Sequence, residues 1–78
     1  MKIYDYEGFA NISGAAIKEQ RRKMKISQEQ LAAQLQVAGI SIDQKAVSRI
    51  ERQERFLADF ELREIARILC MPVEELIK

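Results

Sequence analysis

The residues best suited to a binding chemistry lie in segment 26–51, ISQEQLAAQLQVAGISIDQKAVSRIE. Its pattern predicts two short helices, each with its own start signal, joined by a turn. The second helix carries Lys45 and Arg49, one helical turn apart, on a face that the first helix would leave free. Such side chains donate hydrogen bonds to guanine O6 and N7 in the major groove. The arrangement predicts a helix-turn-helix, and sequence-specific DNA binding is the first hypothesis.

Catalytic and metal-binding chemistry finds little support in the sequence. The chain has no histidine, so its single cysteine, Cys70, lacks the base that would activate it as a nucleophile. Neither a glycine-rich phosphate loop nor a metal-ligand spacing is present. The acidic residues fall at helix starts and on outer faces. We therefore expect a protein that is not an enzyme and that uses no metal or other cofactor.

The distribution of charge is more informative than its sum, which is only +1. Residues 12–27 hold five lysines and arginines against one acid, whereas residues 58–78 hold three against five. A basic region of this kind supplies the electrostatic footprint that DNA binding requires. A solvated helical bundle could show the same split, so this observation supports the hypothesis without deciding it.

Length and composition predict one small all-α domain. The 78 residues include three glycines and one proline, and the apolar periodicity is helical. A single cysteine forms no internal disulfide, and no signal peptide or long apolar run is present. We therefore expect a cytoplasmic protein that does not enter a membrane.

Residues 1–11 show no helical period and are expected to form an irregular or mobile N-terminal arm. Covering the bundle and pairing as a short strand remain open for this arm. Asp5 and Glu7 disfavour its insertion into a DNA groove. Residues 12–78 then form the binding domain.

Local start and stop signals place the helices. A first helix is expected over residues 13–24. Ser27 is expected to open the second in a capping box with Gln30, and Gly39 to end it. Asp43 is a strong N-cap for the third helix. The next apolar repeat predicts a fourth helix that starts after Asp59, and a short fifth helix with Pro72 in its first turn.

The chain resembles, over residues 12–77, the Cro and phage-repressor type of helix-turn-helix regulators, the XRE family. The matching segments occur in the family's order: IKEQRRKMKIS (17–27), SQEQLAAQL (27–35), AVSRIE (46–51) and ELREIARILCMPVEELI (61–77). The resemblance implies a five-helix, lambda-repressor-like domain. Its second and third helices would form the helix-turn-helix, with the third helix in the major groove.

Three positions depart from the family pattern. The turn over residues 36–42 is several residues longer than usual and is similar to a long-turn variant, which affects how the third helix docks. Gln53 stands where the loop after that helix usually has glycine, which would allow the helix to run on. Cys70 stands where glycine usually separates the fourth and fifth helices.

The resemblance also implies roles for individual residues. The positions that would read bases are Gln44, Lys45, Ser48 and Arg49. The matching position for a phosphate contact is Gln28; Ser41, in the long turn, and Arg52 and Arg55, after the third helix, are further phosphate candidates because of where they lie. Arg21 and Glu51 would form a partly buried structural ion pair between the first and third helices. The alternative for the polar positions is an ordinary solvated helix face, and Arg49 could instead pair with Asp43 or Glu51.

The implied partner is a double-stranded DNA operator, and a palindromic one if the protein binds as a homodimer. A dimer contact is expected from apolar residues that do not close the core, among Phe56, Leu57, Phe60, Val73 and Ile77. No small-molecule ligand is evident. The function expected is that of a transcription regulator, in the first instance a repressor. The alternative is a protein-interaction module, such as an antitoxin-like bundle, with little DNA binding of its own.

Overall fold

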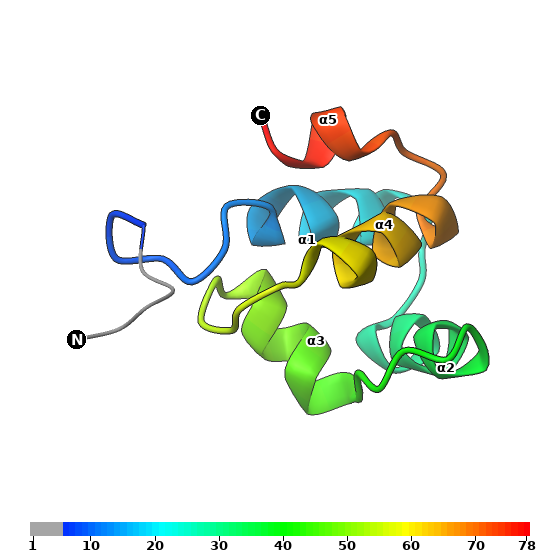
Figure 1. Ribbon diagram of the computed structural model, residues 1–78. Helices are drawn as coiled ribbons and strands as arrows, with labels where there is room; N and C mark the ends of the chain where they lie inside the picture. The colour runs from blue at the N-terminus through cyan, green and yellow to red at the C-terminus, as the bar shows by residue number, and fades with distance from the viewer. Residues whose placement is uncertain (1–5) are drawn as a thin grey trace.

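The computed structural model describes residues 6–78, which fold into five α-helices and confirm the expected all-α class (Figure 1). The helices are α1 (Gly14–Lys23), α2 (Gln28–Val37), α3 (Gln44–Glu51), α4 (Asp59–Ile68) and α5 (Val73–Leu76). Helix α3 packs against α1 and α2, α2 also packs against α4, and α5 lies against α1 and α4. Within the described residues, no helix is long and apolar enough to cross a membrane.

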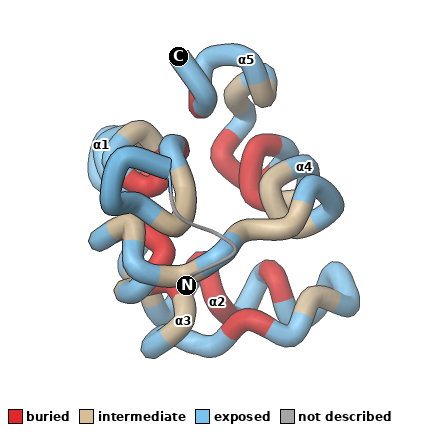
Figure 2. The backbone as a smooth tube through the Cα atoms, turned by 60° about the vertical axis from the view of Figure 1, so that its left-hand side comes forward, coloured by how far each residue is buried: buried red, intermediate tan, exposed pale blue. Residues whose placement is uncertain are grey.

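The core lies where the apolar stripes of the helices face one another, as the buried segments in Figure 2 show. Each of the first four helices contributes at least one almost fully buried side chain, and α5 adds a further one. With Ile42 from the connection before α3 and Leu69 just after α4, the fully buried side chains are Ile17, Leu31, Leu35, Ile42, Val47, Ile50, Ile65, Leu69 and Leu76. The placement follows the helical period of the sequence and fixes which face of α3 remains outside.

The helix starts follow the local signals closely. Ser27 accepts from the Gln30 amide and Gln30 returns the bond to the Ser27 amide, so the capping box of α2 is confirmed. Asp43 caps α3 by accepting from the amide of Ala46. Some boundaries differ by one residue: α1 is one residue shorter at each end than the expected 13–24, α4 includes Asp59 as its first residue, and Pro72 is the N-cap of α5 rather than part of its first turn.

Four helix ends share one geometry, with a residue of positive φ just after the helix. In each, two main-chain amides bond back to the last turn, which is the Schellman arrangement. Glycine fills the position only after α2; the other three hold the side-chain-bearing residues Lys25, Gln53 and Cys70. The expectation that the third helix runs on through Gln53 is therefore wrong. The helix ends at Glu51, and Gln53 adopts the left-handed conformation that glycine would have supplied.

The long turn before α3 is shorter than its sequence suggested, because α2 continues through Gln36 and Val37. The remaining connection is anchored by Ile42, which is fully buried, and by the Gln36 side chain, whose Nε2 donates to the Ile42 carbonyl at 3.4 Å. These contacts hold the connection against the core, so the start of α3 is tied to the end of α2.

Helices α1 and α3 approach closely at Gly14 and Ile50. A side chain at Gly14 would overlap the carbonyl oxygen of Ile50, so glycine is required there by space rather than by conformation. The preceding segment is tied to the same place: the Asn11 side chain donates to the carbonyls of Ile50 and Arg55 at 3.1 and 2.9 Å. Residues 1–5 of the expected N-terminal arm lie outside the described part of the chain.

Candidate nucleic-acid interface

A buried ion pair joins α1 to α3. The Nε of Arg21 donates to Oε2 of Glu51 at 2.6 Å and its Nη2 donates to Oε1 at 3.1 Å, so the pair is bidentate. A third bond, from Nη1 to the carbonyl of Ile26 at 2.7 Å, fixes the end of the guanidinium. The two side chains are 11% and 2% exposed. This is the structural pair that the resemblance implies.

Gln28, the first residue of α2, belongs to the same network. Its Nε2 donates to Oε1 of Glu51 at 3.0 Å, which the sequence analysis did not anticipate. The bond occupies one hydrogen of the carboxamide nitrogen and leaves the second hydrogen and the main-chain amide as donors. Gln28 is therefore held in place by Glu51 while it keeps donors at the N-terminus of α2, where a helix favours an anion.

The outer face of α3 presents the residues expected to read bases. Gln44, Lys45 and Arg49 are exposed, and Ser48 is half-buried between them. Within residues 6–78, the side chains of Lys45 and Arg49 form neither a hydrogen bond nor an ion pair. The alternative of an Arg49 pair with Asp43 or Glu51 is not adopted, since both acids have other partners.

The residues expected to contact phosphates lie in different settings. Ser41 is exposed in the connection before α3. Arg52 lies just after α3, where it donates to the Ser48 hydroxyl and to Glu54 at 3.2 Å. Arg55 donates to both carboxylate oxygens of Glu61 at 3.2 and 3.3 Å. The Arg55 and Glu61 side chains are 25% and 12% exposed, so this pair holds the loop to α4.

A family model described as helix-turn-helix matches residues 17–76. The chain belongs to this helix-turn-helix family. Its motifs and fold are of the XRE type. Membership of this family supports a DNA-binding transcription regulator. No curated protein matches the chain significantly.

Two solved structures are similar over nearly the whole helix-turn-helix domain. The DNA-binding domain of BldD superposes with a TM-score of 0.73 at 22% identity, covering 94% of this chain and 99% of that chain. The restriction-modification controller protein C.AhdI from Aeromonas hydrophila superposes with a TM-score of 0.73 at 26% identity, covering 91% and 99%. The BldD match shows a shared fold, and the C.AhdI match is consistent with it.

Sequence reasoning missed two residues that position this helix-turn-helix surface, Asn11 and Gln53. Nε2 of Gln53 donates to the Asn11 carbonyl at 3.0 Å, and the Gln53 carbonyl accepts from the Ala10 amide at 3.0 Å. Together with the bonds from the Asn11 side chain, they tie the segment before α1 to the loop after α3. Their separation of 42 residues leaves no local signal that could have revealed the contact.

The cations of this helix-turn-helix domain differ in whether they have a carboxylate partner. Among residues 6–78, the lysines and arginines that form no ion pair lie in α1, in the turn that follows it and in α3. They are Lys18, Arg22, Lys25, Lys45 and Arg49. Within the described residues, lysines and arginines without a carboxylate within 4 Å are thus confined to one part of the domain, which includes the face of α3.

Proposed function

We propose that this protein is a sequence-specific transcription repressor that reads the major groove with α3. The observation that carries the proposal is the exposed face of α3, where the side chains of Lys45 and Arg49 lie one turn apart without a partner among residues 6–78. The similar solved structures support it, since one is described as a DNA-binding domain and the other as a restriction-modification controller. Occupancy of an operator is enough to block a promoter, so a binding domain suffices for repression. The protein would act in the cytoplasm.

The proposed chemistry divides the polar residues into two sets. Lys45 and Arg49 would donate to guanine O6 and N7, and Gln44 would bridge adenine N6 and N7 or contact a phosphate. Ser48, held by Arg52, would contact a base at closer range. The residues proposed to bind phosphates are Gln28, Ser41, Arg52 and Arg55. Such contacts fix the register of the protein without specifying sequence.

The decisive experiment is fluorescence anisotropy on a randomised duplex pool, followed by sequencing of the bound fraction. Wild type should bind with a steep salt dependence and enrich one motif. Lys45→Ala/Arg49→Ala should lose the motif, at about 1–3 kcal/mol for each base contact. Arg63→Ala/Arg67→Ala is the matched control, because it removes two exposed arginines from α4. Equal losses in the two double variants would contradict reading by α3.

We also propose that the protein binds its operator as a homodimer. Phe56, Phe60 and Ile77 are 43%, 52% and 42% exposed, whereas Leu57 and Val73 pack against the core. Exposed apolar side chains on one domain mark candidate contact surfaces. Two copies related by a twofold axis would read a palindromic operator. Sedimentation of wild type and Phe60→Asp, with and without the selected duplex, tests this; a wild-type monomer at high concentration under both conditions overturns it.

A protein-interaction module is the second candidate, and the same exposed apolar residues favour it. In that case the partner would be a protein that covers Phe56 and Phe60, and binding would depend weakly on salt. DNA binding through released counterions instead falls steeply as salt rises. The salt titration above therefore separates the two functions. Well-folded protein that fails to bind any duplex at low salt would favour the interaction module.

A further inference from the structure

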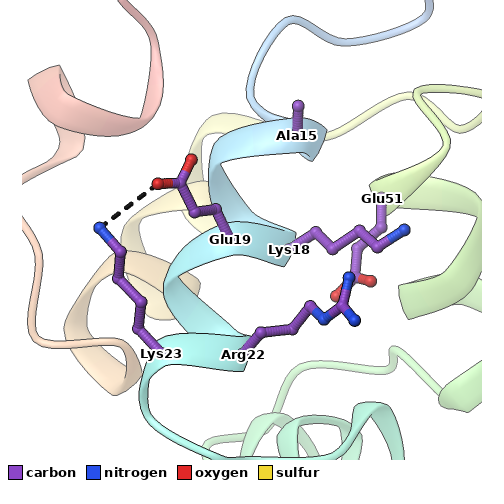
Figure 3. Close-up of a pocket in the computed structure, with 6 residues that line it drawn as sticks. All are labelled: Ala15, Lys18, Glu19, Arg22, Lys23 and Glu51. Carbon is purple, nitrogen blue, oxygen red and sulfur yellow. Dashed lines mark ion pairs between the residues drawn. The ribbon is translucent and has the colours of Figure 1, made fainter.

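An open hollow of about 580 Å³ lies between α1 and the end of α3 (Figure 3). Its walls come from the exposed side of α1 and from one residue of α3. The lining residues are Ala15, Lys18, Glu19, Arg22, Lys23 and Glu51. The hollow thus lies directly beside the buried network that joins the helices.

Two of the three cations at this hollow are turned inward. Lys23 extends to the far side of α1, where it pairs with Glu19 at 3.3 Å. Lys18 and Arg22, one turn apart, both extend toward Glu51 (Figure 3). Neither side chain forms a hydrogen bond or an ion pair with any residue of the described chain. Among residues 6–78, the two inward cations therefore have no carboxylate within 4 Å.

Glu51 cannot serve as their counterion. Its carboxylate already accepts two bonds from Arg21 and one from Gln28, and its side chain is only 2% exposed. With Arg21 included, three cations surround one carboxylate. Like charges one turn apart on a helix destabilise it slightly, and an anion between them would relieve the repulsion.

The position of the hollow indicates which anion it receives. Glu51 links the hollow directly to Gln28, whose donors lie at the N-terminus of α2. If α3 lies in the major groove, the DNA backbone passes the N-terminus of α2 and the adjacent end of α1. We propose that Lys18 and Arg22 bind a backbone phosphate of DNA at the flank of the site that α3 reads. This inference rests on the proposed function and adds a contact from α1 to it.

The test is the salt dependence of binding to the duplex selected by wild type. Lys18→Gln/Arg22→Gln should lower the slope of log K against log salt by about 0.9, since the two side chains neutralise one phosphate and each neutralised phosphate contributes about 0.9. The enriched motif should stay the same, because phosphate contacts carry no sequence information. Lys23→Gln/Lys78→Gln is the matched control: it also removes two charges, but both lysines already have carboxylate partners. Its slope should stay close to that of wild type, because neither lysine is proposed to contact a phosphate.

The outcomes separate this inference from the function on which it rests. Wild type that binds through Lys45 and Arg49, with an unchanged slope in Lys18→Gln/Arg22→Gln, overturns the phosphate contact and leaves the function intact. Wild type without salt-sensitive binding overturns both. Circular dichroism checks that the variants, which alter exposed side chains, remain folded.

Two further experiments identify whether the phosphate belongs to DNA or is a free anion. A duplex with neutral methylphosphonate linkages at its flank should bind wild type and Lys18→Gln/Arg22→Gln with equal affinity. The charged phosphate that Lys18 and Arg22 would contact is missing from this duplex, so removing the two cations loses nothing further. Inorganic phosphate, titrated into the free protein and followed at the Arg22 side chain by NMR, should bind far more weakly than the duplex. Binding of inorganic phosphate as tightly as DNA would assign the hollow to a small anion and overturn the backbone contact.

Discussion

The α1–α3 part of the molecule and the α4–α5 part use charged side chains differently. In the first, a buried ion pair joins two helices, and exposed cations are left without carboxylate partners. From Arg52 onward, every lysine and arginine has an acidic partner within 4 Å. These pairs are Arg52–Glu54, Arg55–Glu61, Arg63–Glu64, Arg67–Glu64 and Lys78–Glu75.

The difference affects the electrostatic potential at the surface more than the stability of the fold. Exposed ion pairs contribute about 0–1 kcal/mol each, so the pairs on α4 and α5 hold little together, apart from the partly buried Arg55–Glu61. Their effect is to cancel positive potential over that part of the surface. The net charge of +1 thus conceals a positive field concentrated over α1 and α3. A polyanion would approach the molecule from this side, and the exposed apolar residues of the other part remain available for a neutral contact.

The largest effect that separates the two parts is expected from Glu51→Ala. The change leaves the guanidinium of Arg21, 11% exposed, without its carboxylate, and should lower the free energy of unfolding by about 3–5 kcal/mol. Glu75→Ala removes the partner of Lys78, where the side chains are 43% and 72% exposed, and should cost less than about 1 kcal/mol. Urea denaturation measures both.

A double-mutant cycle on Arg21 and Glu51 checks that the loss belongs to the pair. Removing both partners should cost less than removing Glu51 alone, because no buried charge is then left over. A cycle with no coupling energy would show that the two residues act separately, and the contrast between buried and exposed pairs would then fail.

A smaller effect is expected from Gly14→Ala, which tests how α1 is held against α3. The added methyl group would overlap the Ile50 carbonyl oxygen, a main-chain atom that cannot turn aside. We expect thermal unfolding to show a loss of about 1–3 kcal/mol, the usual range for overpacking. Ala15→Ser adds an atom at the next, exposed position and should stay within about 0.5 kcal/mol of wild type. Equal stability of both variants would mean that the two helices can separate without cost.

The features predicted from the sequence are those set by neighbouring residues. The starts of α2 and α3 were predictable because a helix cap depends only on the next three residues. Ser27 and Gln30 cap α2, and Asp43 caps α3. The end of α3 could not be predicted in the same way. Gln53 offers no helix-stop signal, yet its amide and that of Glu54 bond back to the last turn.

For the candidate site, the sequence indicated which residues would be available but not what would hold them. The separation in sequence explains the difference: Gln28 and Glu51 are 23 positions apart, and the Asn11 and Arg55 contact spans 44. The exposed state of Lys45 and Arg49 followed from helical period alone. That Arg55 is paired with Glu61 required the position of α4, which no local pattern gives.

The smallest effect, and the sharpest comparison of the two parts, comes from Lys25→Gly and Cys70→Gly. Both residues follow a helix in the left-handed conformation, with φ of 58° and 54°. Glycine relieves the strain of a side chain there but adds freedom to the unfolded chain, so each variant should gain about 0.5–1 kcal/mol. On DNA they should differ: Lys25→Gly removes an unpaired cation beside α1 and should lower the salt slope by up to about 0.9, whereas Cys70→Gly should leave it unchanged. Equal gains in stability with equal salt slopes would show that Lys25 adds nothing to the field over α1 and α3.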